Sequence, residues 1–330
     1  MVSLVVCGAI NWDTSCFVEW LPSPGEEVCV KHITRVSGGT GGNVAVAAAR
    51  ILGAKEVALI GALGEDDLAH QQVAALNGEG VTTAGVNRIR GEESGQAYIL
   101  VDEKGQNVIA SCLGANARLR PEHLNQPAVK HLLEGCQSIA ITDPPLDVVA
   151  ELITSAKQRS IPVLWDPGIL ISHGWKALES LAKQADIVFL NEAEATALFE
   201  TAEPDTSLKY LQRLGFHNHI VLKLGARGAA MLEPATLTVV EAPALPLKEM
   251  DFDVVNTVGC GDVFVGAFAA YRVLGASIRK SLIMASAAAG LNATRPETRG
   301  GPERASLEMV EEQSRNLGFA LRERKLSSLV

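Results

Sequence analysis

The chain has 330 residues, of which 47% are hydrophobic and 20% are charged, and its formal net charge is −9 at pH 7. This size and apolar content predict a folded protein with a large core, built as one large domain or two smaller ones, and the acidic balance argues against a nucleic-acid-binding surface. No apolar run approaches the length of a membrane span, and six scattered cysteines without a Cys-x-x-Cys pair indicate reduced thiols in a cytoplasmic protein.

Short apolar runs with β-branched residues alternate with helix-length stretches through most of the chain. The runs predict strands at residues 4–6, 56–60, 138–141, 162–165, 187–190 and 219–222. The stretches between them predict helices that include residues 43–52, 147–159 and 192–200, and residues 307–324 have the pattern of a charged amphipathic helix. Strand, helix and strand in this order predict an α/β fold whose parallel sheet is covered by helices on both faces.

Two segments break this alternation. Residues 13–36 and 95–114 alternate apolar and polar side chains, which predicts antiparallel strands with one face exposed to water. We expect these segments to form a small sheet that projects from the main domain as a lid. Apolar lid residues could pair between subunits, so a homodimer through the lid is one hypothesis for the assembly.

A glycine-rich cluster lies between the first lid segment and the helix that follows it. Gly38, Gly39, Gly41 and Gly42 surround Thr40 and lead directly into Asn43. Glycines let a polar ligand approach backbone amides, and the Asn43 side chain offers both a donor and an acceptor. The residues alone leave two interpretations open, a ligand site and a mobile hinge between lid and core.

A second glycine-rich turn, Gly259-Cys260-Gly261-Asp262, opens an apolar helix that runs to about residue 274. Backbone amides and the positive end of the helix dipole converge at such a turn and favour an anion. The dipole also favours the ionised form of Asp262, which could then accept a proton from a hydroxyl group. By itself, a turn of this kind is more often an ordinary helix start than an active site.

Together, the early Gly-Gly-x-x-x-Asn and the late x-Thr-x-Gly-x-Gly-Asp patterns resemble the two signatures of the ribokinase-like (PfkB) carbohydrate and nucleoside kinases. Asn191-Glu192-Ala193-Glu194 is similar to the Asn-x-x-Glu motif of that family. Residues 224–228 are similar to its glycine loop on the nucleotide side. The resemblance implies a three-layer αβα fold over residues 1–330 as a single kinase domain, with a mainly parallel sheet and a projecting β-sheet lid.

The resemblance also implies a reaction, the transfer of the γ-phosphoryl group of ATP to a hydroxyl of a ribose-like or related sugar. Asp262 would act as the general base, and the amides of Gly259, Cys260 and Gly261 would form an anion hole. The sugar would contact Asn11, Asp13, Gly39, Thr40, Asn43 and Asp143. The nucleotide would contact Asn191, Lys223, Gly225, Arg227 and Gly228, and Asn191 and Glu194 would hold Mg²⁺ through water.

Several alternatives stay open at this point. Asp143 has the setting of a turn-forming residue as well as that of a sugar ligand. Thr40 stands where ribokinases usually carry Lys, which leaves a nucleoside kinase as the second hypothesis, and a non-catalytic sugar-binding protein is a third. Asn256 stands where the late signature usually begins with Asp, in a region that binds a monovalent cation in ribokinases, so we expect weak or absent activation by K⁺.

Overall fold

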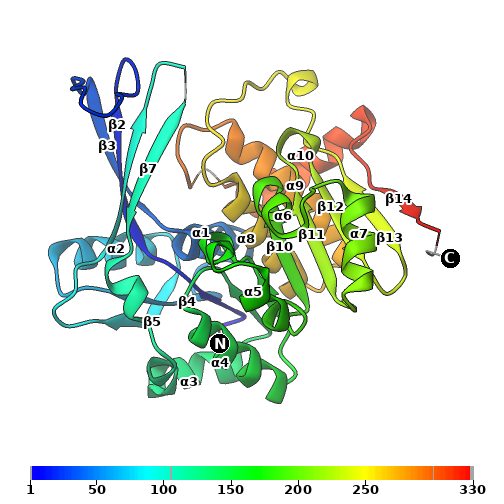
Figure 1. The fold of residues 1–330 in the computed structure, drawn as a ribbon, viewed down its shortest axis with the longest axis horizontal. Coiled ribbons are helices and arrows are strands. Elements are labelled where there is room, and N and C mark those ends of the chain that lie inside the picture. Colours follow the sequence, from blue (N-terminus) through cyan, green and yellow to red (C-terminus); the bar gives the residue numbers. More distant parts are fainter. Residues whose placement is uncertain (1, 105, 300, 328–330) are drawn as a thin grey trace.

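The computed structural model describes residues 2–104, 106–299 and 301–327, and within them the strands form two sheets (Figure 1). The larger sheet has ten strands in the order β14-β13-β12-β11-β10-β9-β8-β1-β4-β5. Neighbouring strands from β5 to β11 are parallel, whereas β12, β13 and β14 are each antiparallel to their neighbours. The bounds are β1 (Leu4–Cys7), β4 (Val57–Leu63), β5 (Thr82–Arg88), β8 (Ser138–Ile141), β9 (Val163–Trp165), β10 (Ile187–Asn191), β11 (His219–Lys223), β12 (Ala229–Glu233), β13 (Thr238–Ala242) and β14 (Arg322–Lys325).

Helices cover both faces of this sheet, and a separate buried apolar cluster lies beneath each helical layer. One layer consists of α1 (Thr40–Leu52), α2 (Asp67–Gly78), α8 (Cys260–Val273), α9 (Ile278–Ala293) and α10 (Arg304–Ser314). The other consists of α3 (Pro127–Gly135), α4 (Leu146–Gln158), α5 (Trp175–Ala182), α6 (Glu192–Phe199) and α7 (Pro204–Arg213). This arrangement confirms the predicted three-layer αβα fold with a mainly parallel sheet.

The connections include short 3₁₀ helices, η1 (Gly114–Arg118), η2 (Pro121–Asn125), η3 (Gly168–His173), η4 (Gly225–Arg227), η5 (Lys248–Met250) and η6 (Arg315–Leu317). Each strand predicted from an apolar run is present in the larger sheet. Of these strands, β1, β4, β8 and β9 are buried along their whole length. Such strands need apolar side chains on both faces. Among the described helices, none combines the length and apolar character that a membrane span requires.

The prediction of one helix over residues 307–324 was wrong in its second half. Helix α10 ends at Ser314, and Gly318 follows with a φ of 84°, which a helix cannot continue. Phe319 is buried and anchors the chain to the core. The chain then pairs with β13 as strand β14, because an uncovered strand edge offers unpaired backbone groups.

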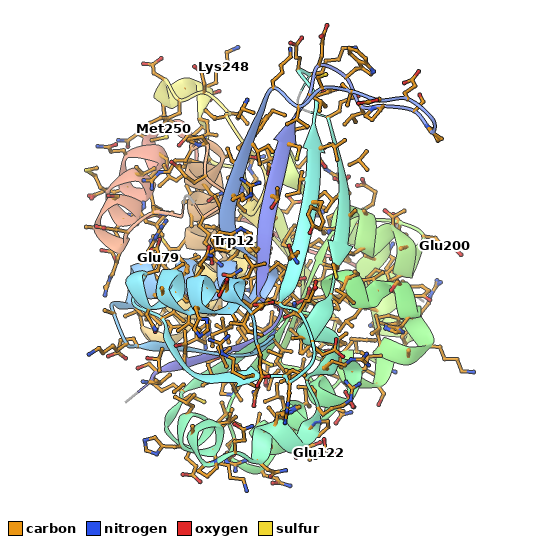
Figure 2. All side chains as sticks on the ribbon, turned by 90° about the vertical axis from the view of Figure 1, so that its left-hand side faces the viewer. Trp12, Glu79, Glu122, Glu200, Lys248 and Met250 are labelled. Carbon is orange, nitrogen blue, oxygen red and sulfur yellow. The ribbon has the colours of Figure 1, made fainter. Side chains whose placement is uncertain are left out.

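The smaller sheet is the predicted lid, and it projects from one end of the main body, as Figures 1 and 2 show. Its strands are β3 (His32–Gly38), β2 (Asn11–Phe17), β6 (Gly95–Val101) and β7 (Asn107–Cys112), in that order. In Figure 2, Trp12 lies at the base of this sheet, beside the main body.

The lid was predicted to consist of antiparallel strands, but its two central strands, β2 and β6, are parallel to each other. Asn11 pairs with Gly95 at their first residues, so both strands start at the same level. Each strand then runs outward from the main body, and each returns through an antiparallel neighbour, β3 or β7.

Helices α1 and α8 pack closely, which brings the two glycine-rich helix starts together. A Cβ atom at Gly266 of α8 would lie 2.5 Å from the Val44 carbonyl oxygen and 2.8 Å from the Ala47 Cβ of α1. Only a residue without a side chain allows this approach. The absence of a side chain at position 266 therefore sets the distance between the two helices.

Gly266→Ala is expected to lower the free energy of unfolding by about 2 kcal/mol, because the added methyl group pushes α1 and α8 apart. Urea unfolding of both proteins at one pH measures the difference. The matched control is Gly78→Ala at the last residue of α2, where a Cβ would meet no atom within 4 Å. An equal loss of stability in both variants would contradict the packing argument.

Candidate active site

The first glycine-rich turn lies against the chain that leaves the central strand β1. Gly39 has a φ of 85°, and a Cβ atom there would lie 2.5 Å from the Asn11 amide nitrogen and 2.6 Å from the Ala9 carbonyl oxygen. Glycine is therefore required both by the backbone conformation and by the close approach. As a result, α1 begins at the carboxyl edge of the sheet, where ligands bind in α/β folds.

The second glycine-rich turn meets the first through a side-chain hydrogen bond. The Asn43 Nδ2 atom donates to the Asp262 Oδ2 atom over 2.8 Å, although the two residues are 219 positions apart. Gly259 precedes α8 with a φ of 78°, and a Cβ there would collide with the Thr298 carbonyl oxygen. The structure thus brings the two signatures, predicted separately, into direct contact.

Asp262 is buried in this junction, and burial raises the pKa of its carboxyl group to about 7. The hydrogen bond from Asn43 and the charge of Lys223 act in the opposite direction, whereas Asp166 and Asp143 add to the increase. Burial therefore outweighs the lowering of the Asp262 pKa that was expected from the helix dipole. A carboxyl group with a pKa near neutrality is suited to exchanging a proton with a bound hydroxyl group.

A buried ion pair lies beside Asp262. Lys223, at the end of β11, donates through Nζ to the Oδ2 atom of Asp166, which directly follows β9. Burial lowers the pKa of Lys223, but Asp166, Glu194 and Asp262 together raise it above its ordinary value. A Cβ atom on Gly261 would lie 3.6 Å from Nζ, so the ammonium group lies next to the first turn of α8.

Lys223 was predicted from the sequence as a site residue, but its partner Asp166 was not. A signal was present, because Asp166 comes immediately after a predicted strand, and Asp143 lies two residues after β8. Polar residues at the carboxyl ends of neighbouring parallel strands meet at one edge of the sheet.

Asn191 and Glu194 form a reciprocal capping box at the start of α6. The Asn191 Oδ1 atom accepts from the Glu194 amide, and the Glu194 Oε2 atom accepts from the Asn191 amide, each over 2.8 Å. Burial and the neighbouring Asp166 raise the pKa of Glu194, while Lys223 lowers it. Within the described ranges, no three His, Cys, Asp or Glu side chains are arranged to hold a metal ion.

Polar side chains also gather at the base of the lid, on strand β2 and beside it. Asp13 is only 8% exposed, and its carboxyl group lies against Gly38; among the described residues, the neighbouring Arg299 donates to Asn43, Ser37 and Gly38 and not to Asp13. Burial raises the pKa of Asp13 to about 6, although the charge of Arg299 lowers it. The Asn11 Oδ1 atom accepts from the Nδ2 atom of Asn116 over 2.9 Å. Asn116 was not predicted as a site residue.

Asp143 and Thr40 contact each other. The Asp143 Oδ1 atom accepts from the Thr40 hydroxyl over 2.6 Å, from the Thr142 hydroxyl over 2.9 Å and from the Ala9 amide over 3.2 Å. Asp143 therefore holds together the turns that follow β1 and β8 and the start of α1. This arrangement agrees with the structural alternative for Asp143, and the second carboxylate oxygen accepts no hydrogen bond from the described residues.

The turn after β11 is exposed to solvent at residues 225–227. Arg227 pairs with Glu192 over 2.8 Å and with Glu203 over 3.1 Å, and these surface contacts do not bring it into the cluster around Lys223. A Cβ at Gly228 would collide with the Ala242 carbonyl, so this glycine permits backbone packing. At Gly225, by contrast, a Cβ would meet no atom within 4 Å, so the space beside it is open.

The chain matches a family model described as pfkB family carbohydrate kinase over residues 1–304. It is 26% identical over 302 residues to the ATP-dependent ribose-1-phosphate kinase of Halopiger xanaduensis, which covers 92% of this chain and 95% of that protein. It is 28% identical to the ribokinase of Haemophilus influenzae, over 89% and 92% of the two chains. The structure of Arabidopsis thaliana ribokinase complexed with ribose and ATP is similar with a TM-score of 0.82 at 26% identity, covering 94% of this chain and 99% of the other.

The raised pKa of Asp262 predicts a pH-dependent effect of its substitution on stability. Because the folded-state pKa is about 7 and the unfolded value is lower, the carboxyl group destabilises the fold increasingly as the pH rises between these values. Asp262→Asn should therefore be more stable than the wild type by roughly 2–4 kcal/mol at about pH 8, and this gain should vanish near pH 4.

Urea unfolding across this pH range measures the difference. Asp253→Asn is the control, because the Asp253 side chain is exposed, and this substitution should not produce a comparable gain in stability. A gain for Asp262→Asn that is the same at every pH would contradict the prediction.

Proposed function

The chain belongs to the pfkB family of carbohydrate kinases and is an ATP-dependent sugar kinase, and on that premise we propose that it phosphorylates a hydroxyl of a ribose-like sugar with Asp262 as the general base. The observation that carries this proposal is the contact between Asn43 and Asp262, since it joins the two glycine-rich helix starts in one polar site. The relatives named for ribokinase and ribose-1-phosphate kinase activity support a ribose-like substrate.

Asp262 would take the proton from the attacking hydroxyl group. Its pKa of about 7 keeps a substantial ionised fraction near neutral pH, and it gives the carboxylate more basicity than an exposed aspartate has. Asn43 Nδ2 holds one carboxylate oxygen in place and leaves the other for the substrate.

The first turn of α8 would hold the charge on the transferred phosphoryl group. Amides in the first turn of a helix lack intrahelical acceptors, and the helix dipole favours an anion there. The Cys260 amide already donates to the Thr257 carbonyl over 3.3 Å, so we propose that Gly261 contributes more to the anion hole than Cys260 does. The Lys223 ammonium group lies beside this turn and would add a positive charge.

The sugar would lie between Asp262 and the base of the lid. Asp13 supports this placement, because a buried carboxyl group to which the neighbouring Arg299 does not donate favours a ligand that donates hydrogen bonds. Asn11, Gly39, Thr40 and Asn43 line the same region around the start of α1. Carboxylate and amide side chains suit neighbouring hydroxyl groups because each can contact two of them.

The nucleotide would lie along the carboxyl ends of β10 and β11, with Gly225 leaving open space beside the chain. We propose that Mg²⁺ binds near Asp166 and Glu194 through water, where it would neutralise phosphate charge. The residues fit this role only partly, because Lys223 holds one carboxylate and the capping box holds the other. Most ligands of the ion would therefore be phosphate oxygens and water, as Mg²⁺ commonly prefers.

We also propose three further properties of the kinase. The Asn256 side chain donates to the Pro296 carbonyl and accepts from the Val258 amide, each over 3.0 Å, which supports turnover that does not depend on K⁺. Six unpaired thiols support a cytoplasmic location. Exposed apolar side chains on the lid support a homodimer through that sheet; they include Ile33, Val36, Tyr98, Val108 and Ile109.

A substrate panel with ATP and Mg²⁺ tests the proposed function. We expect turnover of ribose or a ribose phosphate to exceed that of hexoses and nucleosides, and we expect KCl and NaCl to give equal rates. Asp262→Asn should lower kcat by about 10³-fold while both substrates still bind. Preference for a nucleoside would replace the substrate proposal, absence of any phosphotransfer would favour a sugar-binding protein, and normal turnover of Asp262→Asn would remove this residue from the role of base.

Lys223→Met tests the contribution of the buried cation. Removal of a positive charge beside the first turn of α8 is expected to lower kcat/KM for ATP about 100-fold, because preorganised charges act strongly in a buried site. Lys248→Met is the matched control, since Lys248 is exposed in η5, and it should leave the value unchanged. Equal effects of the two substitutions would show that net charge, and not the position of Lys223, matters.

A further inference from the structure

A segment near the end of the chain lies against both glycine-rich helix starts. The Ala293 carbonyl accepts from the Val255 amide over 2.8 Å, and the Pro296 carbonyl accepts from the Asn256 side chain. The Thr298 carbonyl lies against Gly259, at the position that a Cβ atom would need. Residues 293–299 therefore follow the turn before α8 and lead Arg299 to the start of α1.

The Arg299 guanidinium group lies in the junction between α1 and the lid. Its Nε atom donates to the Asn43 Oδ1 atom over 2.8 Å. Its Nη1 atom donates to the Ser37 hydroxyl over 2.7 Å, and its Nη2 atom donates to the Gly38 carbonyl over 3.0 Å. A planar group with fixed donors thus holds three acceptors in one geometry.

This contact fixes which way the Asn43 amide faces. Because a guanidinium group can only donate, the Asn43 oxygen must face Arg299. The Asn43 nitrogen then faces Asp262, as the hydrogen bond of 2.8 Å between them requires. The reversed amide would place two donors together at Arg299 and two acceptors together at Asp262, and both contacts are unfavourable.

The same guanidinium group holds the end of a lid strand. Ser37 and Gly38 are the last residues of β3, and the Ser37 hydroxyl also donates to Gln72 of α2. Asn43, by contrast, belongs to α1. Arg299 therefore connects the base of the lid to the amide that contacts Asp262.

The backbone around Arg299 is fixed by a second arginine, Arg50. Arg50 of α1 donates to the Arg299 carbonyl oxygen and, over 2.9 Å, to the Gly301 carbonyl oxygen. The Arg50 side chain also forms an ion pair of 2.8 Å with Glu79 at the end of α2, and Glu79 is labelled in Figure 2. The backbone of the segment is thus fixed independently of what the Arg299 side chain contacts.

We propose that Arg299 is a positioning residue for phosphoryl transfer, which orients Asp262 through Asn43. The proposal rests on the proposed role of Asp262. Neither glycine-rich signature contains Arg299, and nothing in the sequence around it indicates a site.

A double-mutant cycle with Asn43 tests this proposal. Arg299→Ala is expected to lower kcat about 10-fold to 100-fold, because a small misplacement of reacting groups has effects of this size, and the KM for ATP should stay within about twofold of the wild type. In the Asn43→Ala background, the same substitution should change kcat by less than about twofold, since the path to Asp262 is already removed. Arg299→Lys should recover part of the loss.

Arg295→Ala is the matched control, because Arg295 lies in the same segment with an exposed side chain, and it should leave kcat unchanged. If Arg299→Ala does not give folded protein, Arg299→Gln replaces it in the cycle. Independent effects of Arg299 and Asn43 on kcat would overturn the proposal. A loss confined to phosphorylated sugars would also overturn it, and would identify Arg299 as a binder of the substrate anion.

Asp262→Asn separates failure of this inference from failure of the proposed function. If Asp262→Asn turns over normally, the proposed base is wrong, and so is the positioning role. If Asp262→Asn is inactive but the effects of Arg299 and Asn43 are independent, only the role of Arg299 is wrong.

Discussion

The arrangement of the site depends on the close contact between α1 and α8. A helix that approaches its neighbour at a glycine can bring its first turn within hydrogen-bonding distance of the other helix, and Gly266 provides that contact. The sheet supports the same geometry, because the chain enters α1 from the lid near the end of the central strand β1. The hydrogen bond between Asn43 and Asp262 is therefore a consequence of backbone packing. The proposed role of Asp262 as a base depends on this packing.

Burial sets the electrostatics of the site. Asp13 and Asp262 both have raised pKa values, of about 6 and about 7, and burial is the largest cause in each case. Lys223 keeps its charge because carboxylates surround it, with Asp166 in direct contact. A site of this kind contains charges that water does not screen fully, so each one acts strongly on a bound phosphate. The same lack of screening makes the carboxylates costly for folding until a ligand or a cation compensates them.

The sequence predicted the parts of the molecule that have local signals. Apolar runs identify β1 and β4 because both faces of these strands are buried, and each glycine-rich start precedes a helix that the structure contains. Asp166 had such a signal and was missed, whereas the other misses depend on distant pairing. Strand β14 forms because β13 offers an edge, and β2 and β6 are parallel because of where each leaves the main body. Arg299 reaches Asn43 from 256 residues away, and nothing in its own neighbourhood in the sequence indicates that contact.

The separation of the site residues along the chain has a consequence for folding. Asn43 and Asp262 are 219 residues apart, so their contact closes a very long loop, and contacts of this kind form late because chain entropy opposes them. Helix α1 and the lid can form from the first third of the chain, whereas α8 and the segment around Arg299 come from its last quarter. We therefore expect the first compact states of this protein to contain much of the sheet but not the contact between Asn43 and Asp262. During refolding, activity should then recover later than helix content.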